Sequence, residues 1–394
     1  MVQAWEQMLS EELSELRRRS RLRACPAFDG SRRARDVTID GRPVKLCFSS
    51  NDYLGLSAHP ALAEAARQGL ATSGAGASAS RLVSGDLPQH RELEFALAEF
   101  ADAEACLLFP TGYQANLGVI SSLAGPQDLV VSDALNHASL IDGCRLSRAT
   151  VKVYPHADVS AAGLALATDT NPVGEPFRRK LLVTESVFSM DGDVAPLSQL
   201  SALCRQNHAA LVVDEAHSMG VLGPGGKGLC IEQGINADVR IGTLGKAFGT
   251  AGGFVLGSRV LRDYLVNRAR TFIYTTASPP SVAAAALAAL NLVRGAEGDT
   301  RRLRLSARIR ELHHALAITR APTPITPIVL GADASALAAS AALLARGIHV
   351  QAIRPPTVPE GTARLRVTLS ADHEDEDIEA LVRVLLETGG KTST

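Results

Sequence analysis

Polar residues of the kind that hold a cofactor follow two short apolar runs of the chain. Residues 214–217 (DEAH) follow the run 210–213, and Lys246 stands between small residues after the run 239–243. A carboxylate beside a buried strand is costly unless it is paired, although Asp214 alone could simply cap the next turn. A lysine amine directly after an apolar run is either exposed to solvent or takes part in chemistry, for example by forming a Schiff base. Together, Asp214 and Lys246 favour pyridoxal 5′-phosphate, whose ring nitrogen needs a carboxylate and whose aldehyde needs an amine.

Other strand ends supply groups that suit the rest of this cofactor. Gly112 and Tyr113 stand where an apolar run passes into a helix, and backbone N–H groups at a helix start bind phosphate. Thr243 precedes the lysine closely enough to reach a phosphate, and Ser189 follows the run 180–185. A histidine could stack on the ring and another could bind its phenolic oxygen. The candidates for these two roles are His137 and His217.

Other chemistries find little support in the sequence. The stretch 74–79 (GAGASA) follows a helical segment, so it lacks the context of a dinucleotide fingerprint, and 225–228 (GGKG) lacks the spacing of a P-loop. No metal site is expected. The formal net charge of −1 predicts neither nucleic-acid nor membrane binding. Scattered cysteines and the lack of a signal-like N-terminus favour a cytoplasmic location.

The elements that must position these residues follow an α/β pattern. Residues 1–20 have the spacing of an amphipathic helix, and a strand pair is expected to turn at Asp40 and Gly41. From about residue 49, short apolar runs alternate with helical stretches, which is typical of a mostly parallel sheet. Residues 272–274 look like a strand, and a last helix is expected to start near Ser370. We therefore predict an N-terminal arm over 1–48, a large cofactor domain over 49–280 and an α+β domain over 281–394.

Several motifs in order resemble the α-oxoamine synthases, pyridoxal-phosphate enzymes of fold type I. They are 51–56 (NDYLGL), 111–113 (TGY), 188–193 (FSMDGD), 214–217 (DEAH) and 243–247 (TLGKA). The resemblance extends over nearly the whole chain from Asn51 to His373. It implies a large, mostly parallel seven-stranded sheet domain, a smaller α+β C-terminal domain and an N-terminal arm.

The resemblance also implies an activity and its residues. Members condense a small amino acid with an acyl thioester and lose CO₂. Segments 80–85 (SRLVSG) and 353–366 look most like the branch that joins L-alanine to a pimeloyl thioester, giving 8-amino-7-oxononanoate in biotin biosynthesis. The carrier could be coenzyme A or acyl carrier protein. The implied catalytic residues are Lys246, His137, Asp214 and His217. Implied phosphate contacts are Gly112, Tyr113, Ser189 and Thr243, and implied substrate contacts are Arg17, Asn51, Thr357 and Arg366.

Two further expectations concern assembly and rival activities. The family resemblance implies a homodimer with shared active sites, in which Thr275 and Thr276 reach the phosphate of the neighbouring subunit. A glycine-using 2-amino-3-ketobutyrate ligase (glycine C-acetyltransferase) and a longer-chain acyl condenser are the alternatives within the family. A regulator built on the same fold would need a DNA-binding module, for which the first fifty or so residues are too short.

Overall fold

The structure is a computed structural model that describes residues 2–30 and 34–387. The chain divides into two compact units, and each is described by itself. The unit that we call the sheet unit comprises Leu56–Ser189 and Asp193–Leu303. The unit that we call the terminal unit comprises Met1–Gly55, Met190–Gly192 and Arg304–Thr394. The two ends of the chain therefore belong to the same unit.

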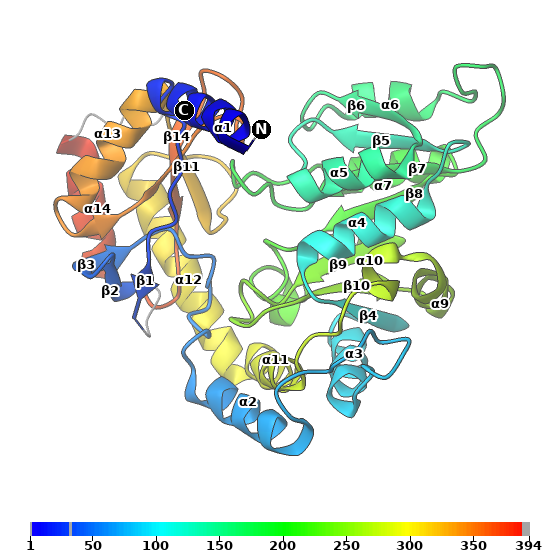
Figure 1. Ribbon diagram of the computed structural model, residues 1–394, viewed down its shortest axis with the longest axis horizontal. Helices are drawn as coiled ribbons and strands as arrows, with labels where there is room; N and C mark the ends of the chain where they lie inside the picture. Colours follow the sequence, from blue (N-terminus) through cyan, green and yellow to red (C-terminus); the bar gives the residue numbers. More distant parts are fainter. Residues whose placement is uncertain (1, 31–33, 388–394) are drawn as a thin grey trace. The chain divides into compact units, whose positions relative to one another are not determined.

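The sheet unit is built on one seven-stranded sheet (Figure 1). Its strands, in spatial order, are β4 (Ala105–Phe109), β10 (Gly253–Gly257), β9 (Val239–Thr243), β8 (Ala210–Asp214), β7 (Lys180–Glu185), β5 (Leu129–Asp133) and β6 (Thr150–Tyr154). Strand β10 is antiparallel to both of its neighbours, and the pairs from β9 to β6 are all parallel. The predicted seven-stranded, mostly parallel sheet is confirmed.

Helices cover both faces of this sheet. On one face, side chains such as Val183 and Val212 pack with the helices α4 (Gly112–Leu123), α5 (Ala138–Ser147), α9 (Arg259–Arg268) and α10 (Arg270–Ile273). On the other face, side chains such as Leu182 and Val213 pack with α6 (Val159–Leu166), α7 (Leu197–Gln206) and α8 (Leu229–Glu232). Alternate residues of one strand thus enter two separate apolar cores, which explains why these strands are continuously apolar.

Further helices complete the sheet unit. They are α2 (Pro60–Ser73), α3 (Pro88–Phe100), α11 (Pro280–Val293) and a short 3-10 turn η1 (Pro224–Gly226). Helix α11, which the alanine-rich sequence predicts, packs along α2 and α3. Helix α12 (Ala296–Ala315) begins in the sheet unit and ends in the terminal unit.

The terminal unit joins segments from both ends of the chain. A four-stranded sheet has the order β1 (Phe28–Asp29), β2 (Arg35–Ile39), β3 (Arg42–Cys47), β12 (Ile348–His349). A three-stranded antiparallel sheet has the order β11 (Ile325–Gly331), β14 (Ala363–Thr368), β13 (Gln351–Ile353). The helices are α1 (Val2–Arg18), α13 (Asp333–Leu344) and α14 (Asp375–Glu387). The expected strand pair around Asp40 and Gly41 is confirmed as β2 and β3.

Two expectations about elements are wrong. Residues 272–274 are not a strand, because α10 includes Phe272 and Ile273, and Tyr274 N–H closes a turn by donating to Arg270 O at 3.0 Å. Phe272 alone of the three is buried, against Phe109 at a ring distance of 5.8 Å, while Tyr274 is 71% exposed. The last helix begins at Asp375, because residues 370–373 form a turn in which Ser370 N–H donates to His373 Nδ1 at 3.0 Å.

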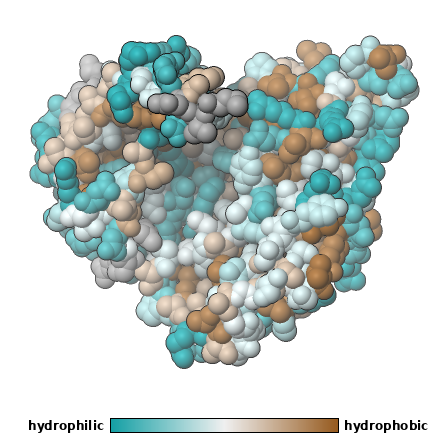
Figure 2. Space-filling view, in the orientation of Figure 1, coloured by the Kyte–Doolittle hydropathy of each residue, from teal (hydrophilic) through white to brown (hydrophobic). Residues whose placement is uncertain are grey.

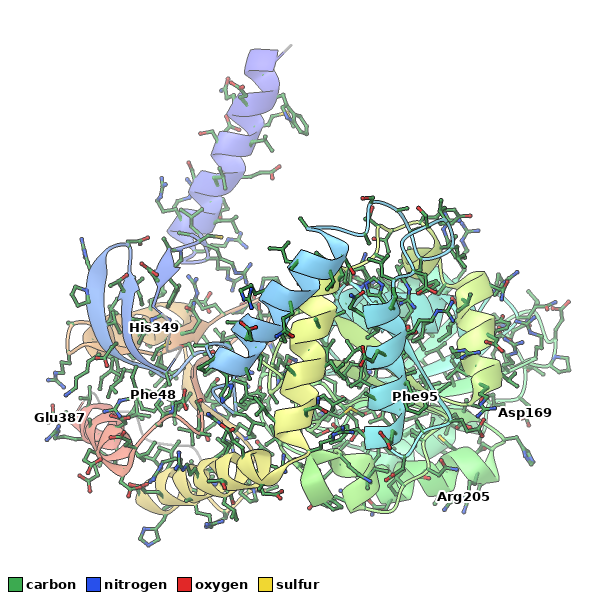
Figure 3. The ribbon with its side chains drawn as sticks, turned by 90° about the horizontal axis from the view of Figure 1, so that it is seen from below. Phe48, Phe95, Asp169, Arg205, His349 and Glu387 are labelled. Atoms are coloured by element: carbon green, nitrogen blue, oxygen red, sulfur yellow. The ribbon has the colours of Figure 1, made fainter. Side chains whose placement is uncertain are left out.

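The surface of both units mixes hydrophilic and hydrophobic residues on the visible face (Figure 2). Helix α1 extends away from the rest of the terminal unit (Figure 3), and its Trp5, Met8 and Leu13 are at least half exposed. In the described residues, no helix is both long and apolar enough to cross a membrane.

Candidate active site

The carboxyl ends of the parallel strands bring the predicted residues of the sheet unit together. Strands β5, β7, β8 and β9 all end at the same edge of the sheet, where open α/β sheets bind ligands. Asp214 is the last residue of β8, and it pairs in register with Glu185 of β7 and Ile241 of β9. Thirteen residues at this edge line a cavity of about 170 Å³, among them Lys246, Asp214 and His137.

Asp214 is a buried carboxyl group of the site. Its Oδ2 accepts a hydrogen bond from Asn116 Nδ2 at 2.7 Å, and its Oδ1 accepts one from the Ala216 amide at 2.8 Å. Asn116 Nδ2 also donates to Ser139 Oγ at 2.8 Å, and Ser139 Oγ lies 2.7 Å from His137 Nδ1. Helices α4 and α5 therefore carry a polar chain that links the carboxylate to the histidine.

His137 is held in place by the start of helix α5. It is the N-cap residue, and its Nδ1 accepts from the Ser139 amide at 3.3 Å. Burial lowers the pKa of His137, although the charge of Asp214 acts in the opposite direction. A neutral imidazole with a fixed plane suits stacking against an aromatic ring, which is the predicted role.

Lys246 and His217 contact one another directly. Lys246 Nζ lies 2.7 Å from His217 Nε2, and both side chains line the same cavity as Asp214. The amine is therefore inside the site, as its setting between small residues predicts. The loops after β8 and β9 supply this pair, so the parallel pairing of two neighbouring strands creates the contact.

The start of helix α4 carries residues that the sequence predicts as phosphate contacts. Thr111 caps the helix by accepting from the Gln114 amide at 3.1 Å, and Gly112 and Tyr113 begin the first turn, whose amides lack helical partners. A Cβ on Gly253 would lie 2.6 Å from Gly112, so β10 approaches this turn closely only because residue 253 is glycine. Thr243 Oγ1 donates to Gly252 O at 3.0 Å and accepts from the Gly245 amide at 3.2 Å.

A second acid, which the sequence analysis does not single out, lies beside Asp214. Glu185 is 2% exposed, and its Oε1 is buried without a hydrogen-bond partner in the described part of the chain. Asn116 Oδ1 is likewise buried without a hydrogen-bond partner in the described residues, and both side chains line the cavity. Buried polar atoms of this kind call for a partner. A polar, ring-shaped cofactor with a phosphate, bound beside Lys246, Asp214 and the start of α4, fits these residues.

A charged histidine fastens two of the loops around the site. His156 Nδ1 lies 2.9 Å from Asp133 Oδ1, and His156 Nε2 lies 2.7 Å from Asp193 Oδ2. Burial alone would lower the pKa of His156, but hydrogen bonds to the two carboxylates raise it to about 10. The loop after β5, which carries His137, is thereby tied to the loop after β7, which carries Ser189. Ser189 itself is buried.

The predicted substrate residues lie in the terminal unit. Arg366, 6% exposed, donates through Nη1 to Asn51 Oδ1 at 3.1 Å, so the structure brings these two residues together. Thr357 accepts from Arg23 Nη2 at 3.2 Å. Arg17 is exposed on α1, and its backbone carbonyl accepts from the Ser20 amide at 3.0 Å. Arg23, which the sequence analysis does not select, is thus the arginine that contacts Thr357.

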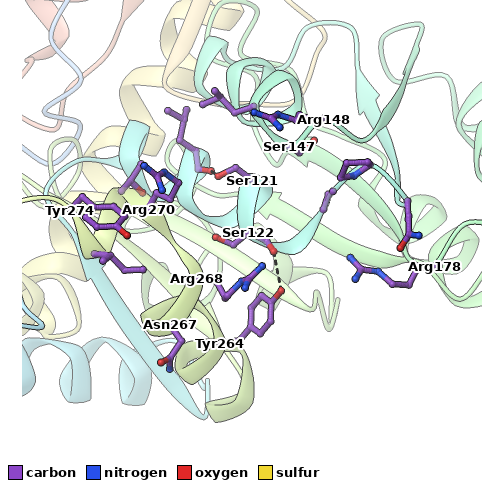
Figure 4. Close-up of a pocket in the computed structure, with 18 residues that line it drawn as sticks. Ser121, Ser122, Ser147, Arg148, Arg178, Tyr264, Asn267, Arg268, Arg270 and Tyr274 are labelled. Carbon is purple, nitrogen blue, oxygen red and sulfur yellow. Dashed lines mark hydrogen bonds between the residues drawn. The ribbon is translucent and has the colours of Figure 1, made fainter.

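A larger hollow of the sheet unit lies elsewhere. It has a volume of about 1170 Å³ and is lined by the C-terminal part of α4 together with α9 and α10 (Figure 4). Two of its arginines have local partners: Arg178 binds Asp128 at 2.7 Å, and Arg270 lies 4.8 Å from the Tyr274 ring. None of the predicted site residues lines it.

Thr275, which was predicted to reach the neighbouring subunit, accepts a hydrogen bond from Gln114 Nε2 at 3.4 Å within the same chain. In the described residues, no group of His, Cys, Asp and Glu is suited to a metal ion.

Known proteins resemble the chain along nearly its full length. A family model described as aminotransferase class I and II matches residues 43–385. An 8-amino-7-oxononanoate synthase of Marinobacter nauticus is 51% identical over 359 residues, which is 89% of this chain and 88% of that protein. One of Janthinobacterium sp. is 48% identical and covers 98% of both chains. The chain belongs to the 8-amino-7-oxononanoate synthase family.

Solved structures agree with this membership of the 8-amino-7-oxononanoate synthase family. A serine palmitoyltransferase of S. paucimobilis with a bound PLP–myriocin aldimine has a TM-score of 0.90 at 31% identity, covering 99% of this chain and 98% of that one. An 8-amino-7-oxononanoate synthase of Francisella tularensis has a TM-score of 0.74 at 30% identity, covering 87% and 97%. The chain is a fold-type-I transferase that depends on pyridoxal phosphate, as the motifs predict.

Proposed function

We propose that the enzyme condenses L-alanine with a pimeloyl thioester to give 8-amino-7-oxononanoate. Alanine loses its α-proton, its Cα forms a bond to the acyl carbon, and the C–S bond breaks to release a thiol. The carboxylate of alanine then leaves as CO₂, and Cα takes up a proton. The observation that carries this assignment is 46–51% identity, over most of the chain, to relatives named for this product.

A palmitoyl-transferring activity is the rival that a specific observation favours. The solved structures with the higher TM-scores are serine palmitoyltransferases, at 0.90 against 0.74 for the named 8-amino-7-oxononanoate synthase. Identity to those transferases is 31%, well below the 51% shared with the Marinobacter protein. Because fold similarity does not determine substrate, we give the closer sequence relationship more weight.

Lys246 is proposed to move the proton at Cα. Bound pyridoxal phosphate supplies an electron sink for the pair of electrons that the departing proton leaves behind. Lys246 Nζ, 2.7 Å from His217 Nε2, is the amine in the cavity that can remove this proton and later return one. Asp214 is proposed as the anionic partner of the ring nitrogen, and the donors from Asn116 and the Ala216 amide support a carboxylate there.

Arg366 and Asn51 are proposed to bind the carboxylate of alanine. A guanidinium recognises a carboxylate in a bidentate way, and Arg366 is held for this by Asn51 Oδ1 and by Thr368 Oγ1 at 2.9 Å. Arg366 is buried, and a buried guanidinium suits an anionic ligand such as this carboxylate.

The acyl chain is proposed to use an apolar groove of the terminal unit. This groove has a volume of about 690 Å³. Most of its lining is apolar, namely Leu13, Leu16, Leu22, Pro355, Pro356, Val358 and Pro359.

Two arginines also line the groove. Arg21 is already paired with Asp333 at 2.8 Å and with Glu360. Arg23 instead donates to the neutral hydroxyl of Thr357. Burial and then the charge of Arg23 lower the pKa of Arg354, while the charge of Asp333 acts in the opposite direction. A terminal carboxylate on the acyl chain would offer Arg23 a charged partner.

The homodimer, the cytoplasmic location and the identity of the thiol carrier stay predictions. Sedimentation of the holoenzyme tests the dimer. Mixed dimers that combine a Lys246→Ala subunit with a Thr276→Ala subunit test the sharing of sites, because one intact site would be restored only if Thr276 acts across the interface.

Measuring kcat/KM for pimeloyl, palmitoyl and acetyl thioesters, each with alanine, glycine and serine, tests the assignment. Pimeloyl with alanine should be the best pair. Glycine should be slower by about tenfold, since one missing methyl in a pocket typically costs about 1–3 kcal/mol. If palmitoyl with serine or acetyl with glycine were the best pair, the proposed substrates would be wrong.

A further inference from the structure

Two carboxyl groups stand side by side at the centre of the site. Glu185 and Asp214 are the last residues of neighbouring parallel strands and pair in register. Side chains two residues apart in a strand point to the same face, and Val183 and Val212, which precede the two acids by two residues, lie in the core beside helices α4 and α5. The two side chains therefore share one face of the sheet, 2% and 7% exposed. Two like charges in such positions repel one another strongly.

The two carboxyl groups differ in how their oxygen atoms are paired. Asp214 accepts from Asn116 and from the Ala216 amide, so both of its oxygens have partners. Glu185 Oε1 is buried without a hydrogen-bond partner among the described residues. Burial and the charge of Asp214 raise the pKa of Glu185 well above its usual range, against the opposing effects of Lys246 and of hydrogen bonds from the backbone of His137 and Ser189. The hydrogen-bond donors at both oxygens of Asp214 therefore favour placing the negative charge of the pair there and not on Glu185.

The contacts of Glu185 also reach two loops of the site. The backbone groups of His137 and Ser189 bind its carboxyl group. His137 follows strand β5 and Ser189 follows strand β7, and both were predicted from the sequence as cofactor contacts. One side chain thus contacts two loops that flank the cavity, and the same side chain helps to line that cavity.

We propose that Glu185 is a positioning residue of this active site: its carboxyl group, kept protonated, fixes the backbone of His137 and Ser189 and offers a hydrogen-bond donor to the cavity. This inference rests on the proposed function of the site as the place where the cofactor binds. It adds a residue to the site and a specific division of charge, with Asp214 ionised and Glu185 neutral.

The experiment compares Glu185→Gln with Glu185→Ala in the holoenzyme, without substrates. Glutamine is neutral and keeps both an acceptor and a donor, so pyridoxal phosphate should dissociate with a Kd within about twofold of wild type. Alanine removes the contacts to both loops and should weaken cofactor binding by about tenfold or more. Thr184→Val is the matched control, because residue 184 is the preceding residue of β7 and faces the opposite side of the sheet.

A pH titration of the visible absorption of the bound cofactor separates positioning from simple packing. In Glu185→Gln its midpoint should match wild type, because no charge has been removed. A midpoint lowered by about one pH unit or more would mean that Glu185 is ionised, and the proposal would fail. It would also fail if Glu185→Ala bound the cofactor as wild type does, or if the glutamine variant were as weak as the alanine variant. Should Glu185→Ala not fold, the glutamine titration still decides. Since no acyl substrate is present, an error in the proposed substrates leaves these results unchanged.

Discussion

Replacing His156 by glutamine should remove a pH-dependent part of the stability of the fold. His156 bridges Asp133 and Asp193 through both ring nitrogens, at 2.9 and 2.7 Å, and stands edge-on to the ring of Phe188. Both hydrogen bonds require protons on the imidazole, so the bridge is complete only in the charged form. Glutamine has a similar reach but carries no charge, and it can satisfy at most one of the two carboxylates as a donor without strain.

The size of the effect follows from the pKa of His156. The two carboxylates raise it from 6.5 to about 10, against the effect of burial. At 1.36 kcal/mol per pH unit, that difference corresponds to about 5 kcal/mol. This is an upper bound, because the side chain is 25% exposed. With an unfolding entropy of about 2.1 cal/mol/K per residue, a chain of 394 residues would change its Tm by at most about 6 °C.

The sign of the pH dependence is fixed by the direction of that shift. A group whose pKa is raised on folding contributes its full stabilisation below the pKa of the unfolded chain and loses it as the pH rises through the folded value. The difference in Tm between wild type and His156→Gln should therefore be largest below pH 6.5, should shrink progressively between pH 6.5 and pH 10, and should be small above pH 10.

Calorimetry of both proteins between pH 6 and pH 11 measures this difference. Because lysines and tyrosines also titrate at high pH, the comparison is made between the two proteins at each pH. His208→Gln, on the turn after α7, serves as the control for the loss of a histidine. A difference in Tm that stays constant from pH 6 to pH 11 would refute the argument. So would an NMR titration of the His156 ring with a midpoint near 6.5.

Three further predictions concern the site itself. Lys246→Ala should fold but lose turnover. Borohydride treatment should attach the cofactor to Lys246 of wild type and leave this variant unlabelled. If peptide mass spectrometry found the label on another residue of wild type, the assignment would be wrong. Asp214→Asn should keep its fold by circular dichroism but lose kcat by at least about 100-fold, because the ring loses its anionic partner; kcat near wild type would remove Asp214 from the scheme. Arg23→Ala should raise KM for a free-acid pimeloyl thioester by about tenfold with little change in kcat, as expected when a contact is equally strong in the ground and transition states. Arg17→Ala should change neither constant. If Arg17→Ala raised KM and Arg23→Ala did not, Arg17 would be the residue that binds the acyl substrate.

The sheet could be predicted from sequence because its strands are buried on both faces. The continuously apolar runs that become β4, β5, β7 and β8 are typical of strands that are covered by helices on both sides. Strand β6 was not predicted, because it lies at the edge of the sheet, where its first four residues alternate between partly exposed and exposed and include Lys152. Residues 272–274 misled for the opposite reason. Three bulky residues in a row look like a strand, but only one of them enters the core.

The candidate site could be predicted in its residue types but not in its division of charge. Parallel strands bring whatever follows them to one edge, so Asp214, Lys246 and His137 could be placed together from their positions after apolar runs. Glu185 and Asp214 are each the acid at the end of an apolar run, and no local sequence pattern distinguishes the two. What distinguishes them is Asn116, which arrives from helix α4 and donates to Asp214. The choice of which carboxyl group keeps its proton therefore depends on a contact between distant segments, and sequence order alone does not contain it.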